Sequence, residues 1–299
     1  KAIRRQRQMC IRDSKESGRI VFRTFAPNAA NVCIFGSFNN WSEEPMTQES
    51  YGVYSFVSDS ADFGDMYKYV IYTKSGERFE HCDPYGFGME LRPQWASYIV
   101  DLSEYKFTDD KWMECRNKNY NSPMNIYEVH LGSWLNNPQN ENGWYNYSEI
   151  ADKLIEYAKK HKYTHLEFLP LSEHPADCSW GYQNTGFFSP TSRYGTAAQL
   201  MELVDKCHKN NIGVIMDFVP VHFAVDGYGL AQYDGSYLYE YPPSDVGISE
   251  WGTCNFNHSR NETRCLVQSA ANFWLEKFHF DGLRTVSYTH LTLPTNSLV

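Results

Sequence analysis

The sequence has no run of about 18 apolar residues, the length that a helix needs to cross a bilayer. Its basic N-terminal stretch is not followed by the apolar segment of a secretory signal. Its eight cysteines include no C-x-x-C pair and no cysteine and histidine spacing suited to zinc. These absences predict a cytoplasmic protein with reduced thiols, no membrane partner and no metal.

Basic residues are fewer than acidic ones, with 27 Lys and Arg against 36 Asp and Glu, so the formal net charge is -9. Nucleic-acid binding depends on clustered lysine and arginine side chains that neutralise phosphates, so no nucleic-acid partner is expected. The sequence contains no Walker loop, no G-x-G-x-x-G and no G-x-S-x-G motif. Phosphate cradles and serine hydrolases with a nucleophile elbow therefore have no support.

Aromatic residues are abundant by contrast and make up 16% of the chain. This is more than a single core needs, so we expect some of them to face a ligand or an interface. At 299 residues, the chain is long enough for about two domains.

The first domain is expected between residues 15 and 115. Short β-rich runs separated by turn residues occur there, and this spacing is typical of an all-β sandwich. The runs lie at 20–25, 32–35, 53–57, 67–72 and 97–100.

The second domain is expected between residues 116 and 285, where strand and helix patterns alternate. Such a series predicts a parallel α/β sheet or barrel. We expect Ser148 to cap the first long helix and Thr196 the second. The expected strands lie at 125–129, 165–169, 213–219 and 280–283, and the third helix lies at 263–278.

The candidate site follows the third of these strands. Asp217 and His222 stand where a buried parallel strand leaves its sheet, the position at which (β/α) barrels keep their active sites. A long loop after the preceding strand carries aromatic side chains suited to stacking on a flat, uncharged sugar ring. These are Trp180, Tyr182, Phe187, Phe188 and Tyr194. The pattern favours an enzyme of neutral carbohydrate.

Several motifs in this order resemble the 1,4-α-glucan (glycogen) branching enzymes of glycoside hydrolase family 13. Residues 23–41 are similar to the start of a family-48 carbohydrate-binding module, and 125–134 to a first barrel strand. Residues 217–222 (DFVPVH) and 280–284 (FDGLR) resemble the first two conserved regions of the family. Residues 251–260 (WGTCNFNHSR) are typical of branching enzymes rather than amylases or debranching enzymes.

This resemblance implies a β-sandwich followed by the N-terminal half of a (β/α)8 TIM barrel, truncated near strand 4. It implies transfer of α-1,4-glucan segments to a 6-hydroxyl, with α-glucan as partner and no cofactor. Tyr182 would stack on the sugar and His222 would hydrogen-bond it. Asp217 would orient the site through Arg284, whose guanidinium supports the nucleophilic carboxylate.

The resemblance fails at the residues that carry the reaction. The family places its nucleophilic aspartate two residues after Arg284, but this position is Val286. Its acid/base glutamate belongs to a later strand. Residues 1–14 and 286–299 resemble translated sequencing adaptors rather than a branching enzyme. We therefore expect a non-native leader and tail around an inactive fragment.

Two other interpretations stay open at this point. A noncatalytic glucan-binding protein needs no carboxylate pair. A debranching or trehalose-releasing relative would have the same module and barrel, although the motif at 251–260 argues against it.

Overall fold

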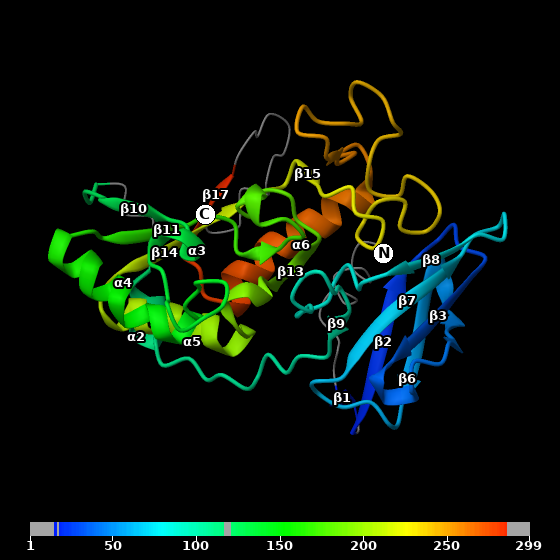
Figure 1. Ribbon diagram of the computed structural model, residues 1–299, viewed down its shortest axis with the longest axis horizontal. Helices are drawn as coiled ribbons and strands as arrows, with labels where there is room; N and C mark the ends of the chain where they lie inside the picture. Colours follow the sequence, from blue (N-terminus) through cyan, green and yellow to red (C-terminus); the bar gives the residue numbers. More distant parts are fainter. Residues whose placement is uncertain (1–14, 17, 117–120, 286–299) are drawn as a thin grey trace.

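The computed structural model describes residues 15–16, 18–116 and 121–285 (Figure 1). The expected leader at 1–14 and tail at 286–299, with Val286, lie outside the described residues. In Figure 1 a β-rich region lies on the right and a mixed α/β region on the left.

The β-rich region consists of two antiparallel sheets, ordered β1-β2-β6-β5 and β4-β3-β7-β8, with β9 paired to β7. The rings of Phe22 in the first sheet and Tyr67 in the second lie 4.9 Å apart, edge to face, so the sheets pack on each other. The predicted sandwich is therefore confirmed. Its strands are β1 (Lys15–Glu16), β2 (Arg19–Phe25), β3 (Asn31–Gly36), β4 (Glu44–Pro45), β5 (Thr47–Gln48), β6 (Val53–Ser58), β7 (Met66–Tyr72), β8 (Arg78–His81) and β9 (Ser97–Tyr98).

The α/β region is built on a parallel sheet of order β10-β11-β14-β17. The predicted alternation of strand and helix is confirmed. The main elements are β10 (Ile126–Val129), α4 (Tyr147–His161), β11 (His165–Phe168), α5 (Ala197–Lys209), β14 (Gly213–Phe218), α6 (Asn261–Lys277) and β17 (Gly282–Thr285). Shorter elements are α2 (Asp110–Cys115), α3 (Leu131–Trp134), β12 (Ser172–Glu173), β13 (Gly186–Pro190), β15 (His222–Phe223) and β16 (Cys254–Asn255).

The starts of the two long helices differ in how well the sequence predicted them. Thr196 caps α5, as expected. Asn146, and not Ser148, caps α4: its side chain accepts from the Glu149 amide over 2.9 Å, and the Glu149 carboxylate accepts from the Asn146 amide over 3.0 Å. This reciprocal pair requires a glutamate three residues after the cap, whereas Ser148 is followed at that spacing by Ala151.

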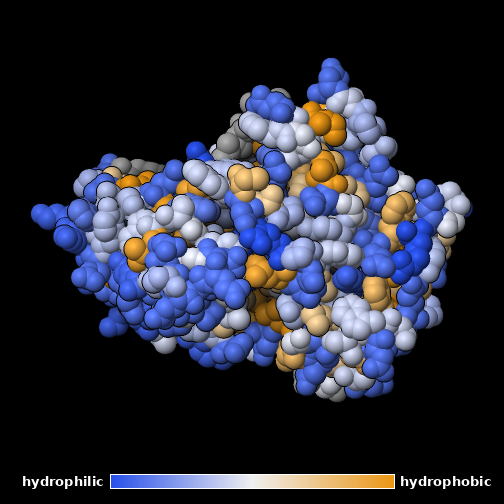
Figure 2. Space-filling view, in the orientation of Figure 1, coloured by the Kyte–Doolittle hydropathy of each residue, from blue (hydrophilic) through white to orange (hydrophobic). Residues whose placement is uncertain are grey.

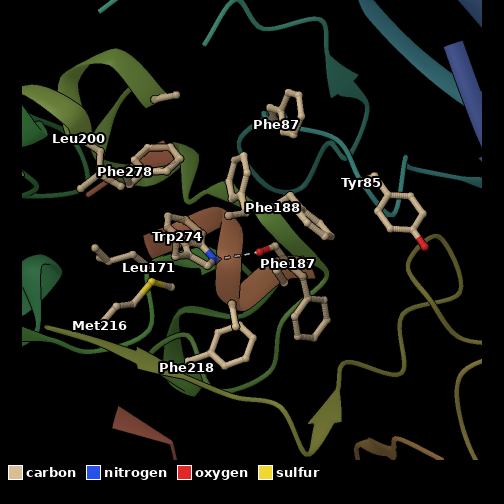
Figure 3. Packing of buried hydrophobic residues seen from close by; sticks show 14 of the residues in the cluster. Tyr85, Phe87, Leu171, Phe187, Phe188, Leu200, Met216, Phe218, Trp274 and Phe278 are labelled. Atoms are coloured by element: carbon tan, nitrogen blue, oxygen red, sulfur yellow. Dashed lines mark hydrogen bonds between the residues drawn. The ribbon is translucent and has the colours of Figure 1, made fainter. Parts of the chain in front are cut away.

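The core under α6 uses aromatic residues that we expected at a ligand (Figure 3). Phe187 and Phe188 are each 1% exposed and Tyr194 is 4% exposed, so the prediction that they stack on a sugar is wrong. Phe187 and Phe188 lie on β13, which is buried along its whole length, and the Trp274 indole donates to the Phe187 carbonyl over 3.0 Å. Tyr194 follows this strand and packs edge to face on Tyr147. A loop pattern in the sequence thus concealed a core strand.

The two regions meet along the insertion between β14 and α6. The ring of Tyr228 stacks on Trp95 with centroids 5.0 Å apart, and the His81 ring bonds to the Gly229 carbonyl over 3.0 Å. Figure 2 shows hydrophobic side chains at several places on the visible face, one of them the area between the two regions. Part of the aromatic excess therefore serves this internal interface.

Candidate functional site

The structure brings Tyr182, Asp217 and Arg284 into one hydrogen-bonded group. Asp217 on β14 and Arg284 on β17 are register partners, and Arg284 Nη1 donates to Asp217 Oδ2 over 2.7 Å. The Tyr182 hydroxyl donates to the same carboxylate oxygen. The hydrogen bond to Asp217 raises the pKa of the Arg284 guanidinium, and burial followed by the bond to Asp217 raises the pKa of Tyr182. Both donors therefore keep their protons at neutral pH.

The second oxygen of Asp217 is the notable group in this cluster. The residue is 1% exposed, and Oδ1 is buried without a hydrogen-bond partner among the described residues. Buried acceptors in proteins are nearly always bonded, so this oxygen calls for a hydrogen-bond donor that the described residues do not supply.

His222 approaches the site from β15 and is 7% exposed. Its Nδ1 lies 2.5 Å from Thr253 Oγ1, and its ring stacks on Trp251 with centroids 5.6 Å apart. Burial lowers the pKa of His222, so the imidazole is neutral at neutral pH.

Tyr182 and His222 both line a cavity of about 360 Å³, a volume typical of small-ligand sites. Asp217 and Arg284 do not line this cavity, but both are hydrogen-bonded to Tyr182, which does. The lining residues are Cys178, Ser179, Tyr182, Gln183, Val219, Val221, His222 and Trp251. The cavity thus combines aromatic walls with a few hydrogen-bonding groups.

Two residues at this site, Trp251 and Thr253, were not among the candidates predicted from the sequence. Their segment served there only as a family marker. Thr253 lies 31 residues after His222 and reaches it because β16 pairs with β15. No local pattern could have indicated this contact. Of the other aromatic residues expected at the sugar, Trp180 is 54% exposed and stacks on His130, whose ring centroid is 5.5 Å away.

No group of three or more His, Cys, Asp or Glu side chains in the described ranges is arranged to hold a metal ion. Likewise, none of the helices in the described part of the chain is both long and apolar enough to span a bilayer.

Two protein families match the chain. Residues 10–86 match carbohydrate-binding module 48 (isoamylase N-terminal domain), and residues 135–237 match the alpha amylase catalytic domain. The putative alpha amylase from Salmonella typhimurium shares the fold, with a TM-score of 0.73 at 21% identity over 89% of this chain and 41% of that one. The fold and site therefore define a binding module followed by part of an amylase-type catalytic domain.

Sequence similarity narrows this class. The chain is 46% identical to the 1,4-alpha-glucan branching enzyme GlgB of Fusobacterium nucleatum subsp. nucleatum over 271 residues, which is 88% of this chain and 44% of that protein. It is 45% identical to GlgB of Francisella tularensis subsp. tularensis over 283 residues, 91% of this chain and 43% of that protein. The chain is thus similar to 1,4-alpha-glucan branching enzymes over most of its own length, and it spans less than half the length of these relatives.

Proposed function

We propose that this site binds one glucosyl residue of an α-glucan such as glycogen or amylose. The observation that carries the proposal is the buried, unpartnered Oδ1 of Asp217, whose other oxygen is held by Arg284 and Tyr182. With Oδ2 held in place, Oδ1 would accept a hydrogen bond from a sugar hydroxyl. The Tyr182 ring offers an apolar face to the pyranose, and His222 bonds it from across the cavity.

The reaction we propose for the family member is transfer of an α-1,4-glucan segment to a 6-hydroxyl, giving an α-1,6 branch in glycogen biosynthesis. A retaining mechanism needs a nucleophilic carboxylate and an acid/base about 5 to 5.5 Å apart. The family resemblance places the nucleophile two residues after Arg284 rather than on β14, so we assign Asp217 to sugar binding and orientation.

The printed sequence carries Val286 where the family resemblance places the nucleophile, so we propose that this chain binds glucan without transferring it. We also propose that its parallel strands are the first half of a (β/α)8 barrel and that the protein is cytoplasmic. Valine at this position is the one observation that favours a purely glucan-binding role. Identities of 45% and 46% to branching enzymes favour that family over a debranching or trehalose-releasing relative.

Titration of the full chain with maltoheptaose by calorimetry tests the binding site. We expect binding to maltoheptaose but not to cellohexaose, whose β-1,4 linkages give a different chain shape. Asp217→Ala should weaken binding at least about tenfold, since a hydrogen bond to a charged group contributes about 1.5 to 3 kcal/mol. Asp245→Ala, at an exposed position in the insertion, is the control. Equal affinities of Asp217→Ala and the unmodified chain would contradict the assignment.

A further inference from the structure

The turn that precedes β16 contains two hydroxyl groups next to His222. Ser249 Oγ lies 2.5 Å from Thr253 Oγ1, which in turn lies 2.5 Å from His222 Nδ1. Thr253 is 1% exposed, so water does not compete for its hydroxyl. The three side chains therefore form a hydrogen-bonded relay from Ser249 through Thr253 to His222, and the donor of each bond can be identified.

Ser249 sets the direction of the first bond. Its Oγ accepts from the backbone amides of Trp251 and Thr253, each over 3.2 Å. A hydroxyl oxygen has two lone pairs and one hydrogen, and the two amides occupy both lone pairs. The hydrogen in the contact with Thr253 must therefore come from Ser249, which makes Thr253 Oγ1 the acceptor.

Thr253 then has only its own hydrogen to offer to His222. Nδ1 must accept it and must be unprotonated, so a neutral imidazole carries its hydrogen on Nε2. Nε2 has no hydrogen-bond partner among the described residues, while the His222 side chain lines the cavity. Trp251 lies over the ring and restricts its rotation.

We propose that Ser249 and Thr253 are positioning residues that hold His222 as the Nε2–H tautomer, so that it donates a hydrogen bond to an oxygen of the bound sugar. This inference rests on the proposed function for the identity of the ligand and deepens it. It gives the segment at 251–260 a physical role, because Thr253 in this segment makes His222 a hydrogen-bond donor toward the ligand. The ligand must present an acceptor oxygen to His222.

Nitrogen NMR of the full chain with labelled histidine tests the tautomer without any sugar. His222→Gln assigns the signals. We expect a pyridine-type Nδ1 and a pyrrole-type Nε2 for His222. Thr253→Val, which keeps the shape of the side chain, should change the Nδ1 signal and allow a measurable fraction of the other tautomer. Thr253→Ser should restore the original signals, and Ser249→Ala should relax the preference if the valine variant is poorly folded.

Maltoheptaose binding is the second measurement. We expect Thr253→Val to weaken it about three- to tenfold, which corresponds to one hydrogen bond, while Thr253→Ser stays close to the unmodified chain. Ser244→Ala, in the same insertion but outside the relay, is the matched control. A protonated Nδ1 in the unmodified chain, or unchanged ring signals in Thr253→Val, would overturn the relay. The expected tautomer in a chain that binds no maltoheptaose would instead overturn the proposed function.

Discussion

Asp217 and Arg284 stand opposite each other on neighbouring parallel strands, and Arg284 Nη1 donates to Asp217 Oδ2 over 2.7 Å. The Asp217 side chain is 1% exposed and that of Arg284 is 44% exposed. Removing the guanidinium would leave a buried carboxylate with Tyr182 as its remaining donor. The ion pair therefore stabilises the pairing of β14 with β17 and also sets the charge of the site.

Arg284→Met should lower the free energy of unfolding by about 1 to 3 kcal/mol, the cost of a buried acceptor that loses a donor. Urea denaturation of the full chain measures this change. The control is Arg78→Met, because the Arg78 and Glu43 side chains are 40% and 31% exposed and such pairs contribute about 0 to 1 kcal/mol. Equal losses in both variants would contradict the assignment of a buried, charge-dependent site.

Tyr182 contributes both a ring and a hydroxyl, and two variants separate them. Tyr182→Ala should weaken maltoheptaose binding by about 1 to 3 kcal/mol, by analogy with the loss of an aromatic stacking platform. Tyr182→Phe keeps the ring and removes only the donor to Asp217, so it should lose less. Calorimetry gives both affinities. If Tyr182→Ala binds as tightly as the unmodified chain, the ring does not contact the sugar.

The sandwich depends on the α/β region for part of its packing. Thr24, which is fully buried in β2, has its hydroxyl 2.6 Å from that of Tyr233 in the insertion. Tyr233→Phe should destabilise the full chain by about 1 to 3 kcal/mol, because the Thr24 hydroxyl stays buried without this partner. Tyr72→Phe removes an exposed bond to Glu43 and should have little effect on the thermal midpoint.

We expect residues 15–114, expressed alone, to unfold cooperatively but at a lower temperature than the same region in the full chain. The two sheets pair their apolar faces without the α/β region, whereas the surface that meets the insertion becomes exposed. Calorimetric melting of the two proteins compares them. A featureless melt of the isolated segment would show that the sandwich cannot fold without the insertion.

His81 makes the interface sensitive to acid. Burial lowers the pKa of His81 from 6.5 to about 4, and its Nε2 has no hydrogen-bond partner among the described residues. Between pH 6.5 and 4 the unfolded chain therefore binds a proton that the folded chain does not. The neutral form of His81 therefore stabilises the folded chain fully above pH 6.5. As the pH falls to 4, the free energy of unfolding decreases by on the order of 3 kcal/mol.

Urea denaturation across this pH range checks the effect. His81→Leu should flatten the acid dependence, although it also costs about 1 kcal/mol at neutral pH because the Gly229 carbonyl loses its donor. The exposed His161→Gln variant should keep the original profile. If His81→Leu shows the same slope as the unmodified chain, another group causes the acid sensitivity.

The chain as printed should show no branching activity, and Val286→Asp should not restore it. The substitution supplies one carboxylate, whereas the retaining reaction also needs a positioned proton donor, which contributes about 10² to 10⁴ in rate. Linkage analysis of amylose incubated with either purified protein provides the measurement. New α-1,6 linkages from either one would refute this prediction.

The sequence was sufficient for the architecture and for the residues at the strand ends. Alternating apolar positions require two faces to be covered, so the sandwich and the βαβα series followed from pattern alone. Asp217 and His222 could be selected because the end of a buried strand is recognisable locally. The helix cap at Asn146 was missed in favour of Ser148, because the deciding partner is the glutamate three residues further on.

Tertiary structure decided which aromatic residues are accessible and what surrounds His222. Tyr182 and Phe188 look alike in the sequence, yet one lines a cavity and the other lies under α6, since burial depends on elements about 90 residues away, such as Trp274 beside Phe187. Thr253 meets His222 only after a long insertion closes and β16 pairs with β15. Such contacts join segments that share no local pattern, so they are determined by packing and hydrogen-bond satisfaction in the folded chain.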